Sequence, residues 1–220
     1  MNDLERSIEL AHAGRLAEAV EETRNQISRY PDRPYLNFWL GILLYDMGEY
    51  ERACEAFRRE LEITPRFRDA AWELGSSCSK LGRPEEAIKA YHSALDIDPC
   101  CIQSLFGLGN VYRRIGNYPE AIEYYKDVLF LEPDLDQSDP RASEKYTKSF
   151  MVYVHYNLGI TWMMTKKLDN AKESFETVQK IGPGGRLAEL SSQYLQLLSD
   201  PNGKLDLTQW NLIELLPEDL

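Results

Sequence analysis

Apolar and polar positions recur along this chain with a period of 34 residues. The dipeptide Leu-Gly occurs at Leu40-Gly41, Leu74-Gly75 and Leu108-Gly109, and it recurs 50 residues further on at Leu158-Gly159. An aromatic residue stands two positions before each Leu, and these residues are Phe38, Trp72, Phe106 and Tyr156. Self-similarity at a period of about 20–50 residues predicts a stack of structural repeats.

Three other residue types keep the same period in the second half of each repeat. They are the glycines Gly14, Gly48, Gly82 and Gly116, the alanines Ala19, Ala53, Ala87 and Ala121, and the prolines Pro31, Pro65, Pro99 and Pro133. Gly tolerates the positive φ of a tight turn, and Pro ends a helix because it lacks the N–H. Each repeat is therefore predicted to be a helix, a turn at the Gly, and a second helix that stops at the Pro. The fifth copy has Lys166 in the Gly position.

This combination of residues resembles the tetratricopeptide-repeat (TPR) family, whose pattern is W-x2-L-G-x2-Y, then A-x3-F, then P. The resemblance covers about residues 2–185. It implies an all-α fold, a right-handed superhelical solenoid of helix–turn–helix repeats. The leading Trp of the pattern is missing, because Asn37, Ala71, Leu105 and His155 stand in its place.

The period also predicts how the chain is divided. Five repeats are expected at about 2–33, 34–67, 68–101, 102–135 and 152–185. Residues 136–151 are a polar insertion, which we expect to lengthen the first helix of the fifth repeat from near Pro140; a disordered loop is the alternative. Residues 186–199 have the apolar spacing of a capping helix, and 200–220 form a turn followed by an acidic but apolar tail.

Composition narrows the class of partner. The formal net charge of −11 and the sequence pI of about 4.9 argue against nucleic acid and anionic membrane as general partners. The first residues lack the basic and apolar segments of a signal peptide, and no apolar run is long enough for membrane insertion, so a cytoplasmic protein is expected.

The four cysteines do not form a disulfide framework. Cys54 and Cys78 are expected to be small buried thiols, and the adjacent Cys100 and Cys101 are either an incidental loop pair or a vicinal redox or metal pair. The three histidines have no metal-ligand spacing. No metal, no cofactor and no catalytic motif is predicted.

Numbering each Leu-Gly pair as positions 7 and 8 places positions 2, 5, 9 and 12 on one helical stripe. In the TPR family this stripe lines the concave groove that binds peptides. The alternative is that the position-5 aromatics replace the missing Trp and belong to the core. The predicted peptide-binding groove consists of Tyr35, Phe38, Ile42, Tyr45, Trp72, Ser76, Phe106, Asn110, Arg113, Arg114, Tyr153, Tyr156, Asn157 and Ile160.

The resemblance also bears on the ligand. Asn110 and Asn157 fall where chaperone-binding TPR proteins keep two clamp asparagines, but Phe106, Leu187 and Ser191 occupy other clamp positions, so the carboxylate clamp is at most partial. The chain is predicted to be a non-catalytic protein-interaction module that binds a peptide or helix of a partner protein. The alternative is a self-associating protein whose residues 204–220 occupy its own or a neighbour's groove, which would give autoinhibition or a homo-oligomer.

Overall fold

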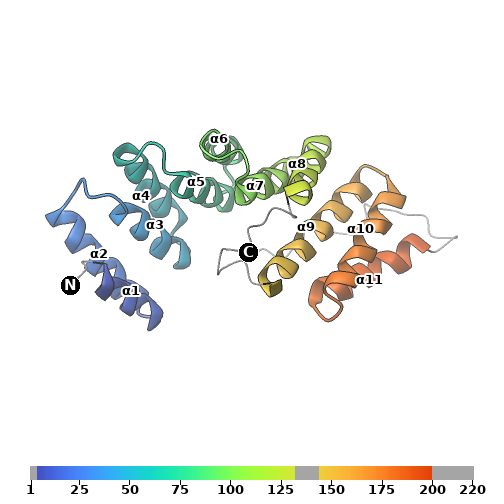
Figure 1. Ribbon diagram of the computed structural model, residues 1–220, viewed down its shortest axis with the longest axis horizontal. Coiled ribbons are helices and arrows are strands. Elements are labelled where there is room, and N and C mark those ends of the chain that lie inside the picture. The colour runs from blue at the N-terminus through green and yellow to red at the C-terminus, as the bar shows by residue number, and fades with distance from the viewer. Residues whose placement is uncertain (1–3, 132–143, 200–220) are drawn as a thin grey trace. The chain divides into compact units, whose positions relative to one another are not determined.

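The structure, a computed structural model, describes residues 4–131 and 144–199. These residues form α-helices and no β-strand (Figure 1), which confirms the predicted all-α class. The helices are α1 (Glu5–His12), α2 (Leu16–Arg29), α3 (Leu36–Asp46), α4 (Tyr50–Ile63), α5 (Arg68–Lys80), α6 (Pro84–Leu95), α7 (Ile102–Arg114), α8 (Tyr118–Leu131), α9 (Glu144–Met164), α10 (Leu168–Ile181) and α11 (Arg186–Ser199).

The chain divides into two compact units, Met1–Val111 and Tyr112–Leu220, with the boundary inside α7. In unit 1, α1 packs on α2, α3 on α4 and α5 on α6, and the pairs are joined by contacts of α2 with α3 and of α4 with α5. In unit 2, α9 contacts α8 and α10, and α11 packs mainly on α10. Each helix thus packs mainly on its neighbours in sequence, which is the arrangement that stacked helical repeats require.

The turns inside the helix pairs are built as the glycine spacing predicted. Gly14, Gly48, Gly82 and Gly116 have φ angles of 74°, 75°, 69° and 82°. At Gly48 the following N–H, that of Glu49, donates to the Leu44 carbonyl at 2.9 Å, which satisfies a carbonyl left free at the helix end. Lys166 has the same left-handed conformation, with a φ of 59°, although it carries a side chain.

The glycines of three Leu-Gly pairs have a packing role. An ideal Cβ built on Gly41 would lie 2.5 Å from the Phe57 ring, one on Gly75 would lie 2.6 Å from Tyr91, and one on Gly159 would lie 2.7 Å from Phe175. The ring of the second helix therefore rests directly on the backbone of the first helix. A side chain at the glycine would push the two helices of the repeat apart.

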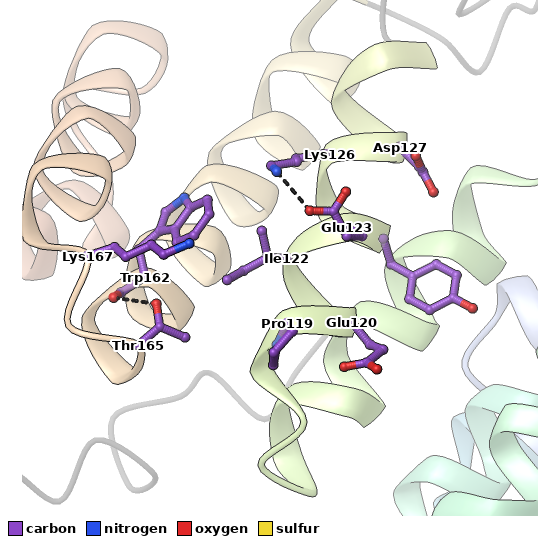
Figure 2. Close-up of a pocket in the computed structure, with 10 residues that line it drawn as sticks. Pro119, Glu120, Ile122, Glu123, Lys126, Asp127, Trp162, Thr165 and Lys167 are labelled. Carbon is purple, nitrogen blue, oxygen red and sulfur yellow. Dashed lines mark hydrogen bonds and ion pairs between the residues drawn. The ribbon is translucent and has the colours of Figure 1, made fainter.

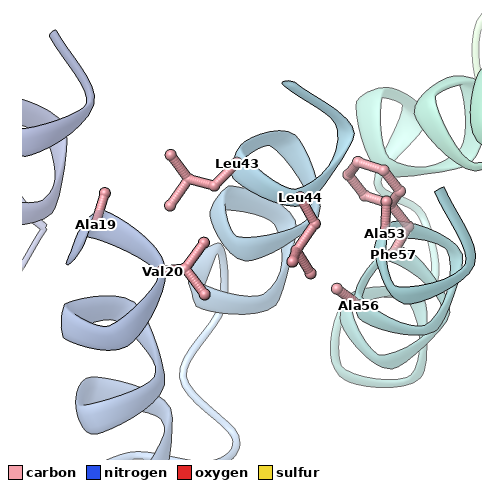
Figure 3. Close-up of a cluster of buried hydrophobic side chains, with 7 residues drawn as sticks. All are labelled: Ala19, Val20, Leu43, Leu44, Ala53, Ala56 and Phe57. Atoms are coloured by element: carbon pink, nitrogen blue, oxygen red, sulfur yellow. The ribbon is translucent and has the colours of Figure 1, made fainter. Parts of the chain in front are cut away.

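The core of unit 1 runs through consecutive helices. Small residues of α2 and α4 face the leucines of α3, and the Phe57 ring closes the cluster on the α4 side (Figure 3). The buried members of this cluster are Ala19, Val20, Leu43, Leu44, Ala53, Ala56 and Phe57. Because the alanines carry only a methyl group, the helices can approach closely enough for the leucines to fill the space between them.

In unit 2, α9 has 21 residues and α11 follows α10. Residues 136–143 of the predicted insertion lie outside the described residues, and residues 144–151 belong to α9. The ring of Tyr194 in α11 stacks on Phe175 in α10 with centroids 5.1 Å apart, so α11 contributes to the same core as α10. The predicted tail, residues 200–220, also lies outside the described residues, so its docking stays a prediction.

Candidate functional site

Half-buried polar side chains gather where α3 meets α5 in unit 1. The Tyr45 hydroxyl lies 3.0 Å from the Ser76 hydroxyl, which joins the two helices. Ser76 also shares a hydrogen bond with the Tyr91 hydroxyl, which is buried beneath it, and this burial raises the pKa of Tyr91. Two predicted groove residues, Tyr45 and Ser76, are thus brought together by the structure.

Carboxylates surround this hydroxyl pair. Burial raises the pKa of Glu73 to about 8, and the nearby charges of Asp46 and Asp69 raise it further in the same direction. Burial also raises the pKa of Asp46. Asp69 is paired with Arg68 at 2.7 Å, whereas within residues 4–131 and 144–199 no ion pair involves Glu73 or Asp46. We call Tyr45, Asp46, Asp69, Glu73 and Ser76 the α3–α5 face.

The aromatics at position 5 lie between core and surface. Phe38 is half-buried, and its ring lies 4.8 Å from that of Phe67, the residue that precedes α5. Trp72 is also half-buried and packs on a cluster that includes Cys101, the residue that precedes α7. Phe67 and Cys101 are 34 residues apart, so the aromatic of one repeat packs against the entry to the next helix pair.

Tyr156 corrects the groove prediction for unit 2. Its side chain is 1% exposed and packs against both Phe175 and Tyr194, with ring centroids at 6.1 and 6.3 Å. Ile160 is also buried, at 2% exposed. Both residues are therefore core. For Tyr156 this agrees with the alternative interpretation of the position-5 aromatics, and Tyr194 of α11 packs on its ring.

Asn157 is also placed differently from the prediction. It is 8% exposed, and its Nδ2 donates to the Tyr153 carbonyl of its own helix at 3.0 Å, so its amide serves α9 and not a ligand. Tyr153 and Arg113 are half-buried, and the Arg113 Nε–H donates to the Tyr125 hydroxyl at 3.4 Å. Of the remaining predicted residues, Ile42, Phe106 and Asn110 are half-buried and Arg114 is exposed.

Tyr35 is 54% exposed and sits at the N-cap of α3 with a φ of 72°, an unusual angle for an aromatic residue. Its N–H donates to Oε1 of Glu60 at 2.9 Å, and its ring meets that of Phe67 edge-on at 5.1 Å. The Glu60 side chain is fully buried, and Oε2 also accepts from the Phe38 N–H at 3.3 Å. Sequence reasoning missed this carboxylate, because a Glu on an amphipathic helix is usually solvated.

Unit 2 contains a cavity of about 750 Å³ between α8, the end of α9 and the turn that follows it (Figure 2). Two ammonium groups approach the Trp162 ring, Lys126 Nζ at 5.6 Å and Lys167 Nζ at 5.0 Å from its centroid. Lys126 is also paired with Glu123 at 2.8 Å. The cavity is lined by Pro119, Glu120, Ile122, Glu123, Tyr124, Lys126, Asp127, Trp162, Thr165 and Lys167.

Two properties of the described residues bear on the class of protein. Residues 4–131 and 144–199 contain no cluster of three or more His, Cys, Asp or Glu side chains arranged to hold a metal ion. In the same part of the chain, none of the helices combines the length and apolarity that crossing a membrane requires. The side chains that stand out on the surface are aromatic, hydroxyl and carboxylate groups, which are suited to contacts with another molecule.

Helix pairs with a left-handed turn, an aromatic ring resting on glycine, and contacts between consecutive pairs define an α-helical repeat protein. Residues 66–129 match one family profile described as tetratricopeptide repeat, and residues 34–67 match a second one. Residues 34–129 therefore carry tetratricopeptide repeats, as the sequence pattern indicated. A comparison with curated protein sequences gives no significant match.

Solved structures with the same fold include three with distant sequences. A MamA fragment from Desulfovibrio magneticus RS-1 is 19% identical, with 82% of this chain and 96% of that chain covered and a TM-score of 0.68. YrrB, described as a TPR protein with an unusual peptide-binding site, is 18% identical over 85% and 88% of the two chains, with a TM-score of 0.64. TTC0263, a thermophilic TPR protein of Thermus thermophilus, is 19% identical over 89% and 98%, with a TM-score of 0.63.

Proposed function

We propose that this chain is a non-catalytic protein-interaction module, and that the α3–α5 face of unit 1 binds a peptide or helix of a partner protein. The observation that carries the proposal is the half-buried position of the Glu73 carboxyl and its raised pKa. A half-buried carboxyl with a pKa raised to about 8, beside Asp46 and without an ion-pair partner among the described residues, is held in an unfavourable electrostatic environment. A cationic group of a ligand would stabilise the ionised form of this carboxyl, which burial and the charge of Asp46 disfavour.

The surroundings of Glu73 suit a peptide. Tyr45 presents an amphipathic ring and a hydroxyl, and Ser76 adds a second hydroxyl that can accept or donate a hydrogen bond. Phe38 on α3 and Trp72 on α5 are half-buried and offer apolar contact on the same two helices. The net charge of −11 is in keeping with a basic or neutral partner. The peptide-binding site of YrrB, a protein of the same fold, is a precedent for this class of ligand.

The ligand class follows from this chemistry. We propose that the partner segment carries a Lys or Arg side chain that pairs with Glu73 and Asp46, and an apolar side chain that contacts Tyr45. Binding of the cation would favour the ionised form of Glu73, so the peptide would displace a proton from that carboxyl. Affinity for a basic peptide is therefore expected to rise with pH up to about 8, the pKa of the free site.

The experiment is a peptide-display selection on the full chain, followed by calorimetric titration of the selected peptides into three proteins. These are the wild type, Glu73→Gln and the matched control Glu55→Gln, which makes the same substitution at an exposed position on α4. We expect basic peptides, weakened about tenfold or more by Glu73→Gln, a loss of about 1.4 kcal/mol, and unchanged by Glu55→Gln. Acidic selected peptides, or equal effects of the two substitutions, would refute the proposed site.

A further inference from the structure

Two cysteines of unit 1 meet at the interface between consecutive repeats. Cys54 lies in α4 and Cys78 in α5, and their sulfur atoms are 3.6 Å apart. Both side chains have no exposed surface, and both thiols are free. The contact joins the second helix of one helix pair to the first helix of the next, at the point where α4 and α5 pack together.

The environment of the two thiols is asymmetric. The two thiols share a hydrogen bond, and this bond lowers the pKa of the Cys78 thiol. The same interaction, together with burial, raises the pKa of Cys54. The guanidinium groups of Arg58 and Arg83 also favour a thiolate at Cys78. Cys78 is therefore the thiol that ionises first, and the Cys54 thiol lies in contact with it.

We propose that Cys54 and Cys78 are a modification site, at which a mild two-electron oxidant of the peroxide class converts the thiol pair into a reversible disulfide between consecutive repeats. The proposal rests on the contact of the two sulfur atoms and is independent of the peptide-binding function. Disulfide formation requires the sulfurs to approach from 3.6 Å to about 2.05 Å, a shift of about 1.5 Å.

The chemistry proceeds in two steps with hydrogen peroxide as the oxidant. The Cys78 thiolate attacks one peroxide oxygen, the O–O bond breaks, and the products are a sulfenic acid at Cys78 and hydroxide, which takes up the thiol proton as water. The Cys54 sulfur then attacks the Cys78 sulfur, the S–O bond breaks, and a second water leaves with the Cys54 proton. Both sulfurs are oxidised by one electron each, and the peroxide is reduced to two water molecules.

The surface above the pair gives the oxidant a route to it. Arg58 is paired with Glu86 at 2.5 Å and Arg83 with Glu51 at 3.3 Å, and all four of these side chains are substantially exposed. Because exposed ion pairs contribute little to stability, these side chains can separate and let a molecule as small as peroxide through. The disulfide would then fix α4 to α5, the helix that also carries Glu73 and Ser76.

A competing thiol must be controlled. Cys100 is exposed, whereas its neighbour Cys101 is 2% exposed with its sulfur 3.3 Å from the Ser104 hydroxyl. Cys100 is therefore the thiol most open to reagents and to intermolecular disulfides. The variant Cys100→Ser removes it and leaves the buried pair intact. The variant Cys54→Ala removes the partner that would resolve a sulfenic acid at Cys78.

The experiment treats the folded full chain with a small excess of hydrogen peroxide, blocks the remaining thiols in denaturant, and identifies linked tryptic peptides by mass spectrometry. We expect residues 53–58 joined to residues 69–80, two hydrogen atoms lighter than the separate peptides and separated again by dithiothreitol. The link should form equally in Cys100→Ser and be lost in Cys54→Ala. It should be the main disulfide of the folded chain and only one of several in chain oxidised in denaturant, because folding holds the sulfurs together.

Two results would overturn the proposal. One is that Cys54 and Cys78 remain reduced, or are oxidised to sulfinic acid without a link, while Cys100 reacts. The other is a Cys54–Cys78 link no more abundant in the folded chain than in the denatured chain. Since the wild-type protein is itself the test sample, neither result can be attributed to a variant that fails to fold.

Discussion

The backbone N–H of Tyr35 donates a hydrogen bond of 2.9 Å to Oε1 of Glu60, a residue near the end of the following helix. Glu60 has no exposed surface, and it also accepts from the Phe38 N–H and, at 3.2 Å, from the Thr64 hydroxyl. No side chain of the N-cap residue caps α3, and the Glu60 carboxylate takes that role. A carboxylate at this position also interacts favourably with the positive end of the helix dipole. It also holds Tyr35 at a φ of 72°.

The first prediction concerns this carboxylate. Glu60→Ala should lower the free energy of unfolding by about 2–3 kcal/mol, because three donors lose their buried acceptor. Glu60→Gln should cost less, about 1 kcal/mol, since the amide oxygen can still accept from Tyr35. Urea denaturation followed by circular dichroism measures both values. Glu55→Gln, an exposed change on the same helix, is the control, and equal midpoints for Glu60→Ala and this control would refute the capping role.

The second prediction concerns the glycine of the Leu-Gly pair. Gly75→Ala should destabilise the chain by about 1–3 kcal/mol, because the new methyl group would lie 2.6 Å from Cδ1 of Tyr91. Tyr91 cannot retreat freely, since its ring also lies against Gly107 of α7. Gly184→Ala is the matched control, because a Cβ there meets no atom within 4 Å and the backbone is not left-handed. Comparable losses in the two variants would show that the ring contact is not tight.

The sequence period predicted the turns and the close helix packing at the Leu-Gly pairs well, because both lie within one helix pair. Gly41 and Phe57, or Gly159 and Phe175, are in the register that the repeat pattern fixes, and the structure places each ring on its glycine. The left-handed turns at Gly14, Gly48, Gly82 and Gly116 follow from the same register. Local spacing decides such contacts, so a single sequence is sufficient to anticipate them.

Contacts outside that register could not be predicted in the same way. Tyr156 was placed on the groove stripe by its position in the repeat, but Tyr194 of α11, which belongs to no repeat, covers it. Cys54 and Cys78 are 24 residues apart, a spacing that coincides with no repeat period, and they meet only because α4 packs on α5. The helical period predicts on which face of its helix a residue lies. Whether that face stays exposed depends on the neighbouring helix, which the period does not predict.

The third prediction concerns Lys166, which occupies the turn position of a glycine. Its φ of 59° is a left-handed conformation that costs a residue with a side chain about 1–2 kcal/mol. Lys166→Gly should therefore raise the free energy of unfolding by about 0.5–1 kcal/mol, after allowance for the greater freedom of glycine in the unfolded chain. The reciprocal change, Gly82→Ala, should lower it by about 1 kcal/mol, because its φ is 69° and the new methyl group meets no atom within 4 Å.

Thermal unfolding monitored by circular dichroism separates these effects. Lys180→Gly is the contrast, because it places glycine in the last turn of the helix α10, where it should destabilise by up to about 1 kcal/mol. The sign should therefore reverse between Lys166→Gly and Lys180→Gly. A loss of stability in both variants would mean that the left-handed conformation at Lys166 carries little strain.

The fourth prediction concerns the pH dependence of stability through Glu73. Its pKa in the folded chain is about 8, against an ordinary value of 4.5, so the folded chain keeps a proton that the unfolded chain releases between these values. Stability therefore falls as the pH rises from about 4.5 to 8 and changes no further above that range on account of Glu73. Glu73→Gln should remove this decline and stabilise the chain above pH 8, by at most a few kcal/mol, since one pKa unit corresponds to about 1.4 kcal/mol.

Urea denaturation of the wild type, Glu73→Gln and Glu55→Gln at a series of pH values measures the effect. The curve for Glu73→Gln should be flatter than that of the wild type between pH 5 and 8, whereas Glu55→Gln should follow the wild type. Burial raises the pKa of Asp46 too, which adds a decline that begins near its ordinary pKa of 3.8 in all three proteins. Parallel curves for all three proteins would place Glu73 in contact with water, and would remove the electrostatic reason for a cationic ligand at the α3–α5 face.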